Sequence, residues 1–190
     1  QNLSQVLRPV SADHPLGTDH LGRDMLARLL YGGRLSLLIG FFAVGIGLAV
    51  GVPLGAISGF QGGRTDLVIQ RFADILLSFP GFLLALSLVA ILGVGLRNVI
   101  ISVGISAVPS FIRLVRGSVL SIREQVYVEA AHALGQRRAV IIFRHVLPNA
   151  MAPVIVQATL SLGFAILVAA GLGFLGLGVQ PPTPEWGTML

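Results

Sequence analysis

Long apolar blocks alternate with short polar segments along this chain of 190 residues. Four uncharged stretches run over residues 35–60, 75–96, 99–112 and 150–179. A membrane-spanning helix needs about 20 mostly apolar residues to cross a hydrocarbon core of about 30 Å. Three of the stretches are long enough, so the pattern predicts an all-α protein, a helical bundle that crosses a membrane several times.

The short third stretch has two interpretations. By length alone, 99–112 fits a re-entrant or interfacial segment. We expect instead a span whose end carries Arg113 and Arg116, because arginine near a helix end extends its guanidinium to the interface. It thereby avoids the cost of about 2.5–3.5 kcal/mol for a charge at the centre of the bilayer. The predicted spans are therefore about 35–60, 75–96, 97–116 and 150–179.

The arginines predict the orientation of these spans. All thirteen basic residues are arginine, and six of them lie between residues 113 and 148. This is the most basic loop and is therefore expected in the cytoplasm. Alternation of the spans then places eight arginines inside and five outside. Residues 1–34 become an external segment, 35–190 the transmembrane domain, and 117–148 its cytoplasmic loop.

Glycine recurs at every fourth residue in the first block, at Gly47, Gly51, Gly55 and Gly59. Small residues at this spacing form a groove on one helix face, where a second helix can approach closely. The alternative is a glycine-rich helix with no particular partner. Both interpretations describe a helix with room for close contact.

Composition narrows the class of protein. Hydrophobic residues make up 54% of the chain and charged residues 11%, with a mean hydropathy of +0.87. Soluble domains carry about a quarter charged residues, and disordered chains carry more charge and less apolar surface. A pI near 11.3 would indicate nucleic acid in a soluble protein. Here the arginines flank apolar blocks, so we expect contact with membrane lipid and none with nucleic acid.

Motifs for catalysis or cofactor binding are missing or misplaced. The lack of cysteine excludes disulfides, zinc-thiolate sites and iron–sulfur clusters, and no P-loop, HExxH or GxSxG is found. Residues 171–176 spell GxGxxG inside an apolar block, which favours helix packing over dinucleotide binding. Asp and His residues between 13 and 24 match no metal-ligand spacing and fit turns and helix caps. We therefore predict no catalytic residue, metal or cofactor, and no enzyme activity.

The loop between the last two spans carries the most specific pattern. Ser121-Ile-Arg-Glu124 fits a capping box, which predicts that a helix begins near Ile122. Gly135 fits the left-handed position after that helix. A second helical stretch over 137–146 should end before Pro148. The sequence thus predicts a helix–glycine–helix hairpin on the cytoplasmic face.

One side of the first helix of this hairpin is apolar. Val126, Ala130 and Ala133 share that side at positions i, i+4 and i+7. Either this side covers the chain's own membrane helices, or it docks into a groove on a partner.

The hairpin also resembles a known sequence pattern. Glu129-Ala-Ala131, followed after three residues by Gly135 and later by Leu147-Pro148, resembles the EAA loop of permease subunits of bacterial ABC importers. His145, in the run His-Val-Leu-Pro-Asn, is similar to the dipeptide, oligopeptide and nickel branch of that family. The stretches 14–24, 63–80 and 173–187 fit the same branch, so the resemblance covers essentially the whole chain.

The resemblance implies the core of a type I-like ABC importer permease in a bacterial inner membrane. Such importers combine two permeases, which we expect to differ here, with two cytoplasmic ATPases and an external substrate-binding protein. The resemblance implies ATPase coupling through Glu129, Ala130, Ala131, Ala133, Gly135, His145, Leu147 and Pro148. The cargo would be a peptide or a related solute, such as a nickel complex, an opine or a glutathione-like compound.

Two expectations concern what lies beyond this pattern. Permeases of this family usually have six membrane segments, so we expect one more before Gln1 and one after Leu190. The alternative function is an ion-coupled secondary transporter. Such transporters often carry ionisable residues at mid-membrane. The four apolar blocks have none, which favours the ATP-driven importer.

Overall fold

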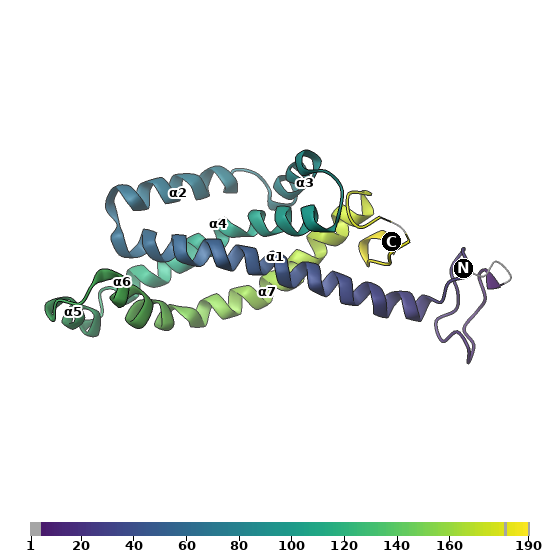
Figure 1. Cartoon of the computed structure of the whole chain (residues 1–190), viewed down its shortest axis with the longest axis horizontal. Coiled ribbons are helices and arrows are strands. Elements are labelled where there is room, and N and C mark those ends of the chain that lie inside the picture. Colours follow the sequence, from purple (N-terminus) through teal and green to yellow (C-terminus); the bar gives the residue numbers. More distant parts are fainter. Residues whose placement is uncertain (1–4, 181, 190) are drawn as a thin grey trace.

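A computed structural model describes residues 5–180 and 182–189 of the chain. The regular elements in these residues are all helices, which confirms the all-α prediction. Three helical stretches are long and apolar enough to cross a membrane. They are α1 (Met25–Gln61), α4 (Leu96–Ile122) and Arg138–Phe174, most of which is α7 (Leu147–Phe174). Figure 1 shows them running lengthwise through the molecule.

The predicted span 75–96 is not one continuous helix. The structure divides this region between α2 (Gly63–Leu77) and α3 (Gly81–Leu92), which are bent by 87° relative to each other. Pro80 is the N-cap of α3. Proline has no N–H to continue a helix, and it disfavours helical backbone in the preceding residue, so α2 ends before it. If the bent pair counts as one broken span, the described residues hold four candidate spans.

Helix α1 begins at Met25, about ten residues before the predicted start. The last part of the predicted external segment 1–34 is therefore helical. The cause is a helix cap, since the Asp24 carboxylate accepts a hydrogen bond from the Ala27 N–H at 2.8 Å.

Helices α4 and α7 also differ from the predicted spans at their ends. Helix α4 continues past residue 116, and α7 ends at Phe174 rather than near 179. The end of α7 is fixed by Gly176, which has a φ of +78°. Its N–H bonds to the Gly173 carbonyl at 2.9 Å, and the Leu177 N–H bonds to the Leu172 carbonyl at 3.0 Å. This is the Schellman pattern that closes a helix.

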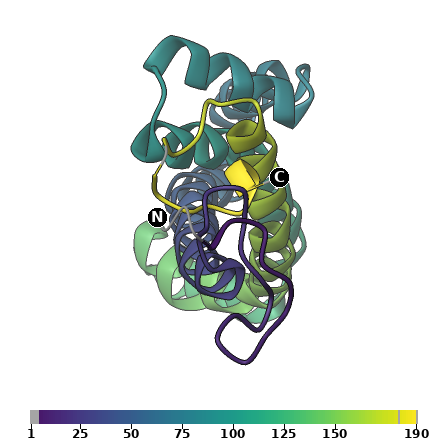
Figure 2. The same ribbon diagram turned by 90° about the vertical axis from the view of Figure 1, so that its right-hand side faces the viewer.

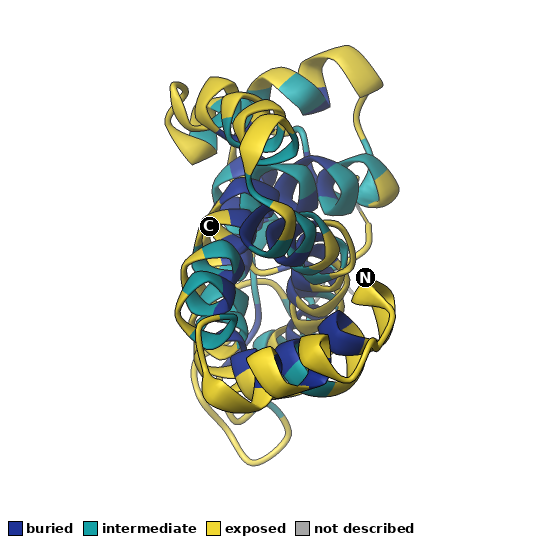
Figure 3. Cartoon of the chain, turned by 90° about the vertical axis from the view of Figure 1, so that its left-hand side faces the viewer, coloured by how far each residue is buried: buried dark blue, intermediate teal, exposed yellow. Residues whose placement is uncertain are grey.

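The hydrophobic core lies where α1, α4 and α7 meet. Ile39 of α1, Phe111 of α4 and Leu172 of α7 are at most 2% exposed. Figure 3 shows the buried residues on the inner sides of the long helices and the exposed ones outside. The outer faces carry large apolar side chains such as Phe41 and Leu167, as the hydrocarbon core of a membrane requires.

The connecting segments gather at the two ends of the bundle. Helix α5 (Val126–Ala133) and the turn between α1 and α2 lie at one end, which we call the α5 end (Figure 1). Residues 5–24 and η3 (Gly187–Met189) lie at the other, which we call the terminal end (Figures 1 and 2). Spans that alternate in direction produce this arrangement.

Candidate coupling site

Helix α5 begins later than the capping box predicted. Ile122 is the last residue of α4, and α5 begins at Val126 after the extended N-cap Gln125. Helix α4 continues through the capping-box sequence because Val119 is fully buried and its carbonyl accepts the Arg123 N–H at 2.9 Å. Burial of a helix face outweighs a local capping preference here.

Helix α5 ends at a left-handed glycine, as the sequence predicted. Gly135 has a φ of +73°. Its N–H bonds to the His132 carbonyl at 3.0 Å, and the Gln136 N–H bonds to the Ala131 carbonyl at 3.2 Å, which is again a Schellman turn. A Cβ at Gly135 would meet no atom within 4 Å. Glycine is favoured here because the left-handed conformation costs most other residues about 1–2 kcal/mol.

Helix α5 has one buried side and one exposed side. Val128 and Ala131 are 0% and 4% exposed. Val126 and Leu134 are each 79% exposed, and Glu129, Ala130 and Ala133 are exposed as well. The apolar side predicted from the sequence therefore points away from the chain's own membrane helices. Exposed apolar surface of this kind marks interaction sites.

The buried side of α5 rests on the next helical segment. This segment is the π-helix η2 (Ile141–Val146), in which Ile141 and Val146 are fully buried. His145 of η2 bonds to the turn after α5, because its Nε2 lies 3.0 Å from Oε1 of Gln136. The ring of His132 stacks on Phe60 at the end of α1, with centroids 5.7 Å apart and an interplanar angle of 16°. Helix α5 therefore contacts both α1 and the segment that leads into α7.

The prediction that the second helical stretch ends before Pro148 is wrong. Residues Arg138–Val140 form the short helix α6, η2 follows, and α7 begins directly at Leu147. Pro148 is the second residue of α7 and follows the π-turn directly, and it has no N–H to bond to a preceding carbonyl. The wider π-turn bonds the Leu147 N–H to the Ile142 carbonyl. Leu147 is half-buried and Pro148 is exposed.

A polar cluster joins three helices near this end. It consists of Ser58, Asp66, Gln70 and Arg116. Arg116 donates two hydrogen bonds of 2.6 Å to the Asp66 carboxylate, from Nε and from Nη2. The buried Ser58 hydroxyl donates to Asp66 at 2.5 Å and accepts from Gln70 at 2.9 Å. The sequence pattern alone did not predict this cluster, although opposite charges at span ends on one side of the membrane were a usable signal.

The four glycines at the four-residue spacing lie on the face of α1 that meets α4. A Cβ at Gly51 would lie 2.5 Å from Phe111 Cβ, and one at Gly55 would lie 2.7 Å from the Ile112 carbonyl oxygen. At Gly47 and Gly59 the nearest atoms of α4 would be 3.1 Å and 2.9 Å away. A side chain at the inner positions would therefore push α4 away from α1.

The GxGxxG sequence lies at the terminal end of α7. A Cβ at Gly171 would lie 2.8 Å from the Phe82 ring, and one at Gly173 would lie 2.5 Å from Oε2 of Glu185. Glu185 is 2% exposed, and its Oε1 accepts the Gly187 N–H at 2.9 Å. These glycines let other segments approach the helix, which confirms the packing interpretation.

The acidic residues before α1 organise turns. Asp19 Oδ1 accepts the N–H groups of Leu21 and Arg23, each at 2.9 Å, and Oδ2 accepts Arg23 Nε at 2.7 Å. Burial raises the pKa of Asp19, but these hydrogen bonds and the guanidinium charge outweigh it and lower the pKa to about 2. Over residues 5–180 and 182–189, no group of three His, Asp or Glu side chains could hold a metal ion.

Known sequences resemble the chain over its whole length. The family model for binding-protein-dependent transport system inner membrane components matches residues 51–190. The dipeptide transport system permease protein DppC of Alkalihalophilus pseudofirmus is 54% identical over 189 residues, which are 100% of this chain and 62% of the relative. The glutathione transport system permease protein GsiD of Pectobacterium atrosepticum is 46% identical over 95% of this chain and 60% of its own. The chain thus spans about three fifths of the length of these relatives.

A solved structure resembles the fold. A chain of the MetNI methionine ABC transporter, in an inward-facing conformation, matches with a TM-score of 0.72. The match covers 82% of this chain and 77% of that chain, at 24% sequence identity. At that identity the likeness concerns the fold alone.

Proposed function

Because the chain belongs to the family of binding-protein-dependent transport system inner membrane components, we propose that it is the permease part of an ATP-driven peptide importer. It lies in the inner membrane, which three apolar helices and one broken span would cross. The observation that carries the proposal is the exposed apolar side of α5. The peptide and glutathione permeases among its relatives support short peptides as the cargo, in preference to a nickel complex.

In this function α5 inserts its exposed side into a groove on a cytoplasmic ATPase subunit. The chain has no P-loop and no lysine, so the partner ATPases bind and hydrolyse ATP. Val126, Ala130 and Ala133 would contact the groove, and Glu129 would lie at its edge. Gly135 supplies the sharp turn that lets α5 project from the bundle.

Movement of the ATPases would reach the membrane through two connections. The first is η2, which is continuous with α7 and carries the buried side of α5. The second is the stack of His132 on Phe60 at the end of α1. Because the glycine face holds α1 against α4, these two helices would move as one body. The result is a rigid-body switch between inward-facing and outward-facing packings.

The remaining partners follow from the same proposal. A second, different permease would complete the path, and an external substrate-binding protein would deliver cargo at the terminal end. The coupling residues are those of the α5 hairpin: Glu129, Ala130, Ala131, Ala133, Gly135, His145, Leu147 and Pro148. Of these, Ala131 faces the chain's own core and would support the hairpin from inside.

A cysteine cross-link tests the proposal in the full-length subunit assembled with its ATPases. The 190 residues contain no cysteine, so Ala133→Cys introduces a single reactive site here. We expect it to cross-link to a cysteine in the ATPase groove, with a yield that changes on adding ATP. Ala131→Cys, on the same helix but 4% exposed, is the matched control and should not cross-link.

Two other outcomes would contradict the proposal. If Ala133→Cys reacts with a cytoplasmic reagent but never cross-links, the ATPase does not dock here, and the secondary transporter becomes the better interpretation. Uptake that stops when the ion gradient is removed and does not depend on ATP would support that alternative. If the thiol reacts only from outside, the orientation of the chain is reversed.

A further inference from the structure

A cleft opens between the broken span, α4 and α7. Its volume is about 420 Å³, within the range of about 300–1,000 Å³ for sites that hold small molecules. Most of its wall is apolar, and none of the residues that line it is charged. The coupling site described above lies elsewhere, at the α5 end.

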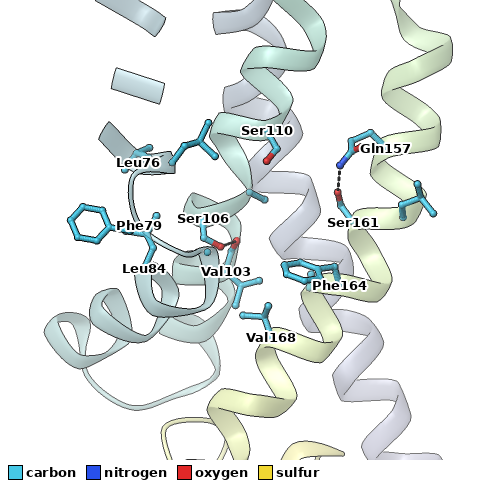
Figure 4. A pocket seen from close by; sticks show the side chains of 15 residues that line it. Leu76, Phe79, Leu84, Val103, Ser106, Ser110, Gln157, Ser161, Phe164 and Val168 are labelled. Carbon is cyan, nitrogen blue, oxygen red and sulfur yellow. Dashed lines mark hydrogen bonds between the residues drawn. The ribbon is translucent and has the colours of Figure 1, made fainter. Parts of the chain in front are cut away.

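Four uncharged hydrogen-bonding side chains interrupt this apolar wall. Ser106 and Ser110 are one turn apart on α4, and Gln157 and Ser161 are one turn apart on α7. Figure 4 shows the two pairs on opposite walls of the cleft. The spacing of four residues on each helix aligns each pair along the direction in which a solute would cross the membrane.

These side chains retain free hydrogen-bonding capacity. Gln157 Nε2 donates to Ser161 Oγ at 3.2 Å, and Ser106 Oγ donates to the Val103 carbonyl at 2.8 Å. In these bonds the Gln157 carbonyl oxygen and the lone pairs of Ser106 take no part. A hydroxyl has two acceptor lone pairs and one donor, and an amide has both kinds of group. The walls can therefore offer both donors and acceptors to a solute.

The broken span gives an independent reason to expect water in this cleft. Leu77, Phe79 and Gly81, which flank the 87° bend, all line it. Phe79 is 56% exposed, so this non-helical backbone is not enclosed by the described residues of the chain. At membrane depth such backbone is tolerated only where it is buried in protein or lines a water-filled cavity.

We propose that this cleft is the chain's wall of the translocation path, and that Ser106, Ser110, Gln157 and Ser161 contact the backbone of a short peptide in transit. This inference rests on the proposed import function and adds the residues that meet the cargo. Peptide groups carry one donor and one acceptor each, which matches the walls. Uncharged contacts hold cargo loosely enough to release it and do not select for the charge of its side chains.

Thiol accessibility tests the assignment in the full-length subunit assembled with its partners in proteoliposomes. Any cysteine outside these 190 residues is first replaced. Ser161→Cys and Ser110→Cys are each treated with a charged, water-soluble methanethiosulfonate reagent. The matched control is Thr159→Cys, which is exposed on α7 between Gln157 and Ser161 but does not line the cleft.

We expect both cleft thiols to react at least about tenfold faster than the Thr159→Cys thiol. A transported dipeptide, loaded on the binding protein with ATP present, should slow their reaction, and modification should block uptake. If both cleft thiols react as slowly as the control in every nucleotide state, a helix or lipid fills the cleft and the assignment is wrong. ATP-driven dipeptide uptake by the unmodified variants is measured in parallel. If the unmutated complex shows no ATP-driven dipeptide uptake, the proposed import function itself is wrong.

A second variant tests the contact with cargo directly. Gln157→Glu places a negative charge on the wall, and Thr159→Glu places one on the opposite side of α7. With the same binding protein, Gln157→Glu should lower the uptake of acidic dipeptides relative to basic ones by about fivefold. An unchanged ratio, equal to that of Thr159→Glu, would show that this side chain does not meet the cargo.

Discussion

The interface between α1 and α4 is closely packed along its length, whereas the hairpin around α5 is packed on one side and exposed on the other. The interface runs along about three turns of α1, where glycine allows α4 to approach to the distance of backbone contact. Helix α5 of the hairpin is held by the buried Val128 and Ala131 and by the stack of His132 on Phe60, and its other side is exposed. Glycine serves both regions, as a flat surface at Gly51 and as a left-handed turn at Gly135.

This contrast suggests a way in which a membrane protein can transmit movement. Close-packed helices resist small shifts, because each displacement costs many van der Waals contacts. A helix held by a few contacts moves at much lower cost. When the loosely held α5 hairpin is displaced, the closely packed α1 and α4 can follow as one body without changing their own packing. The following predictions test this contrast, beginning with the largest expected effect.

Filling the glycine face should break the stiff part. In Gly51→Leu the new side chain meets Phe111 and the Val108 carbonyl, so we expect a loss of stability of about 3 kcal/mol or more. Gly45→Leu is the control, since a Cβ there meets nothing within 4 Å on the same helix. Thermal unfolding in detergent, followed by size-exclusion chromatography, measures both. Equal melting of the two variants would mean that α1 and α4 are not tightly packed.

Removing one charge of the polar cluster should weaken the stiff part without crowding it. Asp66→Asn keeps the shape but loses two charge-assisted bonds to Arg116, and we expect a cost of about 1–2 kcal/mol. Asp74→Asn is the control, because the Asp74 and Arg113 side chains are 47% and 55% exposed and such pairs contribute less than about 1 kcal/mol. If both variants melt alike, the cluster adds nothing beyond an ordinary surface ion pair.

Changing the turn should affect the movable part alone. Gly135→Val forces a branched side chain into a left-handed conformation, at a cost of about 1–2 kcal/mol to the hairpin. We expect about tenfold slower peptide uptake, with the melting temperature and the amount in the membrane unchanged. Gly135→Asn should retain most of the activity, because asparagine tolerates this conformation. Wild-type uptake by the valine variant would remove Gly135 from the coupling step.

The smallest effect should come from the N-terminal turn, which belongs to neither region. The pKa of Asp19, about 2, lies below its usual 3.8, so its carboxylate stabilises the folded turn above about pH 4. That stabilisation is lost as the pH falls through about 2. Hydrogen exchange of the Leu21 and Arg23 amides, corrected for intrinsic rates, should show less protection at pH 2 than at pH 5. In Asp19→Asn this pH dependence should disappear, while uptake at neutral pH stays near that of the wild type.

Hydrophobic patterning predicted where the three long apolar helices lie, but it predicted their ends poorly and did not predict the break in the fourth stretch. The blocks mark where apolar residues lie, whereas helix ends depend on single contacts such as the Asp24 cap and the Gly176 turn. The bend at Pro80 was present in the sequence as a proline within an apolar block. Its direction depends on packing against α4, which no local pattern contains.

The part of the candidate site that depends on the backbone conformation of a single residue was predictable. Gly135 is an example, because a left-handed helix end has a sequence signal. The buried side of α5 was not predictable, because it depends on where η2 lies. The four polar residues of the cleft are scattered within two apolar blocks, and only the fold brings them to facing walls.

The π-helix η2 has a geometric consequence for the two ends of the molecule. Each π-turn takes in about one residue more than an α-turn, and one residue corresponds to about 100° of rotation around a helix. Segment η2 lies between α6 and α7 in one continuous helical stretch, Arg138–Phe174, and the buried side of α5 packs on it. It therefore sets the angular position of α7 relative to α5, and with it the direction in which Gln157 and Ser161 point. A turn at the α5 end thus fixes which face of a helix is presented deep in the membrane.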